Sequence, residues 1–124
     1  MAVEKKLVKD IMAKGKKLVT CGPKQKVAEA MELMVKNKVS GLPVVDDTGK
    51  VVGVISEADV MLAPKTATVK LKMTAEPITI CGSATIKAAA KLLTEKKIKR
   101  ALVLNEDGTL AGIVSRTDVI KAML

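Results

Sequence analysis

The sequence predicts an α+β fold in which two pseudo-two-fold-related β-α-β-β-α units pack through their small sheets. Two observations carry this prediction. The chain of 124 residues repeats itself with an offset of 59 residues. Within each copy, short apolar segments typical of strands alternate with segments of helical periodicity. Apolar residues make up 48% of the chain and none is Phe, Tyr or Trp, so the core must be aliphatic.

The repeat aligns residues 20–60 with residues 79–119 without a gap. The residues of the first copy that meet an identical partner are Thr20, Ala30, Leu33, Lys38, Val44, Gly49, Gly53, Ser56, Asp59 and Val60. Such a repeat indicates two copies of one unit that cannot bury its apolar face alone. The predicted division is residues 1–62 for the first unit with its N-terminal segment, 63–68 for a linker and 69–124 for the second unit. Together they should form one compact module.

Each unit is predicted to contain the same elements. A short helical turn at residues 8–12, whose counterpart ends at Met73, precedes an extended segment at residues 17–20 or 77–80. A helix follows, because apolar residues recur at i, i+3, i+4 and i+7 from Val27 and again from Ile86. Two hairpin strands and a second helix complete each unit. The strands are residues 42–45 and 50–55, then 101–104 and 110–114, and the last helices are residues 56–61 and 115–124.

A Ser-x-x-Asp pattern stands at the start of each last helix, as Ser56 with Asp59 and Ser115 with Asp118. The Ser hydroxyl can accept a hydrogen bond from a free amide of the first turn, and the Asp carboxylate can accept one from the Ser amide. A single copy is best interpreted as a capping box. The second copy, again between an apolar strand and a helix, favours a functional role as well.

Composition limits the classes of function. Lys and Arg number 22 against 13 Asp and Glu, a net charge of +9. That excess favours an anionic partner such as a nucleotide, a nucleic acid or an anionic lipid, unless it is only a solvated lysine-rich surface. The chain contains no His, no nucleophile paired with a base, no Walker-type loop and no metal-binding cluster. An enzyme is therefore not expected.

The remaining expectations concern location and the two cysteines. The apolar runs are too short for a membrane span, and the first residues lack the apolar run of a signal peptide, so a cytoplasmic protein without membrane contact is expected. Cys21 and Cys81 have no metal-ligand spacing around them. They are predicted to be small buried hydrophobic residues, with a disulfide as the alternative.

The repeated motifs resemble those of the cystathionine β-synthase (CBS) domain family, as a tandem pair that covers nearly the whole chain. The matching stretches are residues 39–46, Gly49 and residues 53–59, then residues 98–104, Gly108 and residues 112–118. The resemblance implies a non-catalytic regulatory and energy-sensing module. Its ligand would be AMP, ADP, ATP or S-adenosylmethionine, bound in clefts between the two units without a cofactor. A basic nucleic-acid-binding module is the alternative.

The resemblance also implies two sets of site residues, each drawn from both units. One cleft would combine Ser115, Thr117 and Asp118 with Leu18, Val19, Ser40 and Leu42. The other would combine Ser56 and Asp59 with Ile78, Thr79, Arg100 and Ala101. The Asp carboxylates would accept hydrogen bonds from a ribose diol, and the helix starts would suit a phosphate. Arg100, with Lys99 and Arg116 as further candidates, would contact phosphate.

The helices carry apolar residues beyond a single core stripe. These residues are Leu33 beside Met34, Leu92 beside Leu93, and Val119, Ile120, Met123 and Leu124. A helix that is apolar on two sides favours a partner. The sequence therefore predicts a homodimer joined through helices, with the two pairs forming a flat disc. Because the sequence contains no effector domain, its output would pass through an effector protein that the sequence does not name, or through its own assembly.

Overall fold

The computed structural model describes residues 6–15 and 18–124. The chain packs as two compact units. The first-repeat unit is Val19–Pro77, and the second-repeat unit is Ile78–Leu124 together with the N-terminal segment up to Leu18. The division by sequence, at residues 1–62 and 69–124, keeps the N-terminal segment with the first repeat. In the structure this segment packs with the second repeat.

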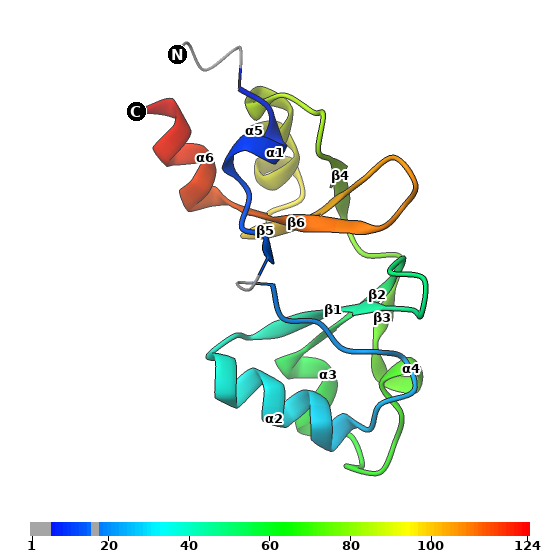
Figure 1. The fold of residues 1–124 in the computed structure, drawn as a ribbon. Coiled ribbons are helices and arrows are strands. Elements are labelled where there is room, and N and C mark those ends of the chain that lie inside the picture. The colour runs from blue at the N-terminus through cyan, green and yellow to red at the C-terminus, as the bar shows by residue number, and fades with distance from the viewer. Residues whose placement is uncertain (1–5, 16–17) are drawn as a thin grey trace. The chain divides into compact units, whose positions relative to one another are not determined.

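The first-repeat unit consists of a small sheet covered by helices. Its elements are α2 (Val27–Asn37), β1 (Gly41–Val45), β2 (Val51–Ser56), α3 (Glu57–Met61), α4 (Val69–Lys72) and β3 (Thr74–Ala75). The sheet has the order β1-β2-β3, with antiparallel pairing throughout. The three helices lie on one face of this sheet (Figure 1). The hairpin strands and both helices predicted for this repeat are therefore confirmed.

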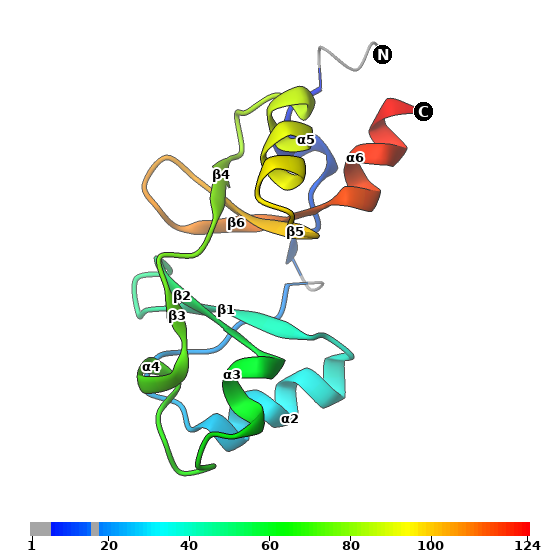
Figure 2. The same ribbon diagram turned by 180° about the vertical axis from the view of Figure 1, so that it is seen from behind.

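The second-repeat unit has the same architecture. Its elements are α1 (Val8–Ile11), β4 (Thr79–Cys81), α5 (Ile86–Glu95), β5 (Arg100–Leu104), β6 (Leu110–Ser115) and α6 (Arg116–Met123). β4 runs parallel to β5, and β5 runs antiparallel to β6. The helices again cover one face of the sheet (Figure 2). The predicted α+β class, with two small three-stranded sheets, is confirmed.

The two sheets differ at their edges, and the sequence did not predict how. In the first-repeat unit the extended segment expected at residues 17–20 is not a strand over residues 18–20, and residue 17 lies outside the described residues. At this edge of the first-repeat unit Cys21 alone forms a parallel bridge, to Val44. At the equivalent edge of the other unit a whole strand, β4, pairs with β5. Strand β3 was not predicted, because two exposed residues carry no alternating pattern.

The short segments before each repeat pack on the sheet of the other repeat. Thr74 pairs with Val54 in the first-repeat unit, and Ala13 pairs with Ile113 in the second. Two of the repeated glycines allow this close approach. A Cβ atom on Gly53 would lie 2.8 Å from the Thr74 carbonyl oxygen, and one on Gly112 would lie 2.5 Å from that of Ala13. Only a glycine fits such a backbone contact.

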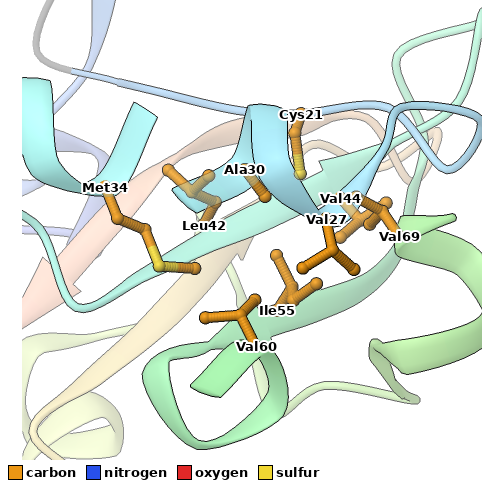
Figure 3. Packing of buried hydrophobic residues seen from close by; sticks show 9 residues of the cluster. All are labelled: Cys21, Val27, Ala30, Met34, Leu42, Val44, Ile55, Val60 and Val69. Atoms are coloured by element: carbon orange, nitrogen blue, oxygen red, sulfur yellow. The ribbon is translucent and has the colours of Figure 1, made fainter. Parts of the chain in front are cut away.

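Each unit has its own aliphatic core. In the first, α2 contributes Val27, Ala30 and Met34 at helical spacing, and these side chains pack against the sheet (Figure 3). The sheet and the other helices contribute Cys21, Leu42, Val44, Ile55, Val60 and Val69. The second core contains Val8, Ile86, Ala89, Leu93, Ala101, Val103, Val114 and Val119. The helical stripes predicted from the sequence are thus the buried faces.

Some residues predicted to join two copies are instead packed within their own unit. Leu33 and Leu92 pack against their respective cores, and Val119 is buried. They widen the core stripe of the helix by one position rather than forming a second apolar face. Ile120, Met123 and Leu124 are exposed, as that prediction requires.

The two cysteines occupy different environments, and both are free thiols. Cys21 is buried, whereas Cys81 is exposed, so the prediction that both are buried is wrong for Cys81. The cause is register: Ile80 occupies the repeat position of Cys21 and packs against its core, and neighbouring residues of a strand face opposite sides. Burial also raises the pKa of the Cys21 thiol to about 11.

We expect the two thiols to react with a disulfide reagent at very different rates. At pH 8 a thiol of pKa 11 is only about 0.1% ionised, and the thiolate is the reacting species. Cys81 should therefore react first in the native protein, and Cys21 only when the unit unfolds. Kinetics of thiol labelling test this, with Cys81→Ser as the control that should remove the fast phase. Equal rates for both thiols would contradict the assignment.

Candidate functional site

The repeated Ser-x-x-Asp pattern forms a capping box at the start of α3. Strand β2 ends at Ser56, which caps the helix. The Asp59 Oδ2 atom accepts hydrogen bonds from the Ser56 amide at 2.8 Å and from the Ser56 hydroxyl at 3.0 Å. Within the described part of the chain the Asp59 Oδ1 atom accepts no hydrogen bond. One carboxylate oxygen is thus committed to the cap and the other is available.

The start of α6 repeats this geometry. The Ser115 amide donates to Asp118 Oδ2 at 2.9 Å, and the Asp118 amide donates to the Ser115 hydroxyl at 3.1 Å. Both side chains are half-buried, while Thr117 is exposed. Asp118 Oδ1 likewise accepts no hydrogen bond from the residues that the structure describes. The capping interpretation is confirmed at both copies, and it leaves an oxygen free at each.

The residues that begin each hairpin lie beside the helix start of the same unit. Gly41 pairs with Ser56 across β1 and β2, and Arg100 pairs with Ser115 across β5 and β6. The carbonyl oxygen of the residue before each strand accepts from the first helix amide. These bonds join Glu57 to Ser40 and Arg116 to Lys99, each at 3.0 Å.

The two helix starts differ in charge. In the second-repeat unit Lys99, Arg100 and Arg116 are exposed, and Arg100 pairs with Ser115 across the sheet while Arg116 follows Ser115 in the chain. The equivalent positions of the first-repeat unit hold Ser40, Gly41 and Glu57. An anion is therefore attracted more strongly to the start of α6 than to that of α3. Glu57 was predicted only as part of the repeated motif. Its alignment with Arg116 in the repeat already indicates that the two helix starts differ in charge.

The remaining predicted site residues fall into two groups. Leu42 and Ala101 are buried in their cores, so only their backbone is open to a ligand. Leu18, Val19 and Thr79 are half-buried, and Ile78 is exposed. Thr79 pairs with Leu102 in the sheet, two residues from Arg100. The structure thus brings together Ser40, Ser56 and Asp59 in one unit, and Thr79, Arg100, Ser115 and Asp118 in the other. The pairing of these groups across units stays a prediction.

The described residues contain no group of His, Cys, Asp or Glu that could hold a metal ion. Across residues 6–15 and 18–124, each helix is too short or too polar to cross a membrane. Each helix start presents a carboxylate oxygen and a hydroxyl, and in the second-repeat unit several exposed cations lie close to them in the chain.

Comparison with known families decides which proteins share this arrangement. A family model described as the CBS domain matches residues 8–65 and, a second time, residues 68–124. The chain belongs to the CBS domain family. Ser56 and Asp59 lie within the first CBS match, and Ser115 and Asp118 lie within the second. Each match is continuous in the sequence. In the packed structure, by contrast, the segment that precedes each repeat belongs to the unit of the other repeat.

Relatives of this CBS pair include proteins of quite different length. It is 32% identical over 150 residues to the chloroplastic CBS domain-containing protein CBSX2 of Arabidopsis thaliana, covering 94% of this chain and 63% of the relative. It is 35% identical over 103 residues to inosine-5'-monophosphate dehydrogenase of Rhodopirellula baltica, covering 82% of this chain. The chain spans only 19% of that dehydrogenase, so the enzyme's activity does not transfer with the match.

The fold of the CBS pair also matches a solved structure. The structure of CBSX2 in complex with AMP superposes with a TM-score of 0.84 at 37% identity, covering 94% of each chain. This CBS relative therefore combines the same fold with a bound adenosine nucleotide.

Proposed function

We propose that this CBS pair is a non-catalytic regulatory module that binds an adenosine ligand in clefts formed between its two units. The ligand is AMP, ADP or ATP, with S-adenosylmethionine as a further candidate. The observation that carries the proposal is a repeated helix-start carboxylate, at Asp59 and Asp118, whose Oδ1 atom accepts no hydrogen bond from the described residues. The AMP complex of CBSX2 supports the choice of ligand class.

The chemistry of these helix starts suits a nucleotide. A ribose diol offers two hydroxyl donors, and a carboxylate with one free oxygen can accept them while Oδ2 keeps the cap. Of the first amides of each helix, one bonds to a carbonyl and another to the Ser hydroxyl. The amides of Ala58 and Thr117 make no hydrogen bond to the described residues, and we assign them to phosphate or ribose oxygens.

Each proposed cleft takes its ribose carboxylate from one repeat of the sequence and its adenine-facing segment from the other repeat. Leu18, which precedes the first repeat, packs in the unit that also holds Asp118. Asp118 works with Leu18, Val19, Ser40 and Leu42, and Asp59 works with Ile78, Thr79, Arg100 and Ala101. Because the side chains of Leu42 and Ala101 are buried, we assign the ligand contacts of these two residues to their backbone groups. The cations Lys99, Arg100 and Arg116 are assigned to phosphate.

The proposal also covers the location, the assembly and the output of the protein. We place the protein in the cytoplasm, as a homodimer joined through helices. It transmits the state of its nucleotide to an effector protein rather than turning it over. Nucleic-acid binding is the competing function, supported by the net charge of +9.

Calorimetric titration with AMP, ADP, ATP and S-adenosylmethionine tests the proposal. At least one of the four should bind saturably, and 2'-deoxy-AMP should bind more weakly than AMP because it lacks one ribose donor. ATP should remain intact during incubation. Absence of binding by all four ligands would refute the proposal. Binding of an oligonucleotide whose affinity falls steeply with salt would favour the nucleic-acid alternative instead.

A further inference from the structure

A basic surface lies where the start of α2 packs beside α4 in the first-repeat unit (Figure 1). Backbone hydrogen bonds fix this contact. The Lys70 amide donates to the Pro23 carbonyl oxygen at 2.9 Å, and the Ala28 amide donates to the Lys65 carbonyl oxygen at 3.1 Å. The contact brings together five exposed lysines, which together with Leu71 form what we call the α4 surface: Lys24, Lys26, Lys65, Lys70 and Lys72.

Leu71 stands between two of these lysines and is 76% exposed. The chain around it, from residue 60 to residue 75, contains no Asp or Glu. The first turn of α2 carries one acid, Glu29, whose carboxylate accepts hydrogen bonds from the Gln25 side chain and the Lys26 amide. None of the five ammonium groups forms an ion pair with a residue that the structure describes. The α4 surface thus combines unpaired positive charge with an aliphatic side chain held in water.

The second repeat builds the same corner without this surface. There α1 makes the backbone contact that α4 makes in the first repeat, with the Lys9 amide donating to the Gly82 carbonyl oxygen at 3.0 Å. Asp10 stands at the position of Leu71, and its carboxylate accepts a hydrogen bond from the Leu7 amide. The positions of Lys24 and Lys26 hold Ser83 and Thr85. The fold therefore requires neither the exposed leucine nor these two lysines, and we infer that they serve contact with another molecule.

The chemistry of the α4 surface indicates an anionic lipid bilayer. The cavities of about 430 and 170 Å³ in the two units are lined by other residues, so the surface offers neither of them to a bound peptide. Lysines around an exposed aliphatic side chain suit a membrane, where ammonium groups meet anionic headgroups and the apolar side chain enters the acyl boundary. A nucleic acid would leave Leu71 unused, and the chain has no aromatic ring on which a base could stack.

We propose that the α4 surface docks this protein on an anionic membrane, with its lysines at the headgroups and Leu71 inserted between them. A contact of this kind lies on the bilayer and requires no spanning helix. The expected absence of membrane contact rested on spanning segments and so does not apply to it. Docking adds a place of action to the proposed regulatory module and does not depend on nucleotide binding.

Co-sedimentation with lipid vesicles tests the docking. The protein should sediment with vesicles made of phosphatidylglycerol and phosphatidylcholine in equal parts, and should stay in solution with phosphatidylcholine alone. Added salt should release it, because the attraction between exposed charges is screened. Sedimentation with neither kind of vesicle, or equally with both, would overturn the proposal.

Two kinds of substitution locate the contact on the α4 surface. Leu71→Gln keeps the charge and removes the inserted side chain, so the vesicle affinity should fall about tenfold. Lys70→Gln and Lys72→Gln should each lower it about fivefold, the loss of one headgroup attraction. All three side chains are exposed, so the variants should fold, and circular dichroism verifies this.

Matched controls come from the end of the chain, where Lys121 and Leu124 are also exposed. Lys121→Gln and Leu124→Gln should leave the vesicle affinity almost unchanged. If they weaken binding as much as the α4 variants do, the net charge of +9 acts from the whole surface and the proposed contact is wrong. Binding of a duplex oligonucleotide that is insensitive to Leu71→Gln, without binding to vesicles, would overturn the lipid assignment and favour the nucleic-acid alternative. Nucleotide titration of the same variants is a separate measurement, so the proposed ligand function stands or fails independently.

Discussion

Replacing Asp118 by Ala should weaken binding of the adenosine nucleotide in its cleft by about ten- to a hundredfold. The change removes charge-assisted hydrogen bonds to the ribose diol, worth roughly 1.5–3 kcal/mol in total. The structure explains why binding and capping can coexist: Oδ2 accepts from the Ser115 amide at 2.9 Å, while Oδ1 is unoccupied among the described residues. Asp59→Ala should have the same effect on the other cleft.

The same substitutions should also destabilise the protein without ligand. Loss of the capping carboxylate costs roughly 1 kcal/mol of unfolding free energy. Asp118→Asn should lose less affinity than Asp118→Ala, because the amide keeps one acceptor oxygen but sacrifices the charge. Each variant therefore needs two measurements, which are the affinity by calorimetry and the melting temperature of the unliganded protein.

Asp47→Ala is the matched control for the loss of a carboxylate. Asp47 is exposed in the turn between β1 and β2, outside the helix starts, so its removal should change neither affinity nor melting temperature appreciably. If Asp59→Ala and Asp118→Ala both keep full affinity while the melting temperature falls, the repeated pattern serves only as a pair of helix caps. The ribose assignment would then be lost.

Leu93→Ala should lower the free energy of unfolding by about 2–5 kcal/mol, which is among the largest stability effects that we expect from a single change in this chain. Leu93 is only 2% exposed and packs within the core of the second-repeat unit. The substitution loses apolar burial and leaves a cavity, because a core without aromatic residues has few bulky neighbours able to move into it.

Urea unfolding followed by circular dichroism measures this loss, since the chain has no aromatic fluorophore. Leu71→Ala is the matched control, because it is the same substitution in α4 at a side chain that is 76% exposed. It should change stability by less than about 0.5 kcal/mol. Similar losses in the two variants would show that Leu93 does not belong to a packed core.

The sequence by itself determined the local structure of both repeats. The capping boxes at Ser56 and Ser115 could be predicted because their atoms lie within one helical turn. The helical spacing of Val27, Ala30 and Met34 predicted the buried face of α2, because helix periodicity and burial are local properties. The internal repeat then applied each prediction to the second copy, including the positions of the two helix-start carboxylates.

Only the tertiary structure decided features that depend on contacts between distant segments. It placed Ala13 against Ile113 and Thr74 against Val54, which exchanges the segments before the two repeats. It turned the Cys81 side chain outward. A short segment carries the same apolar pattern whichever sheet it joins, and a one-residue shift of register reverses the face of a side chain. Pairing and register are therefore decided by packing rather than by local pattern.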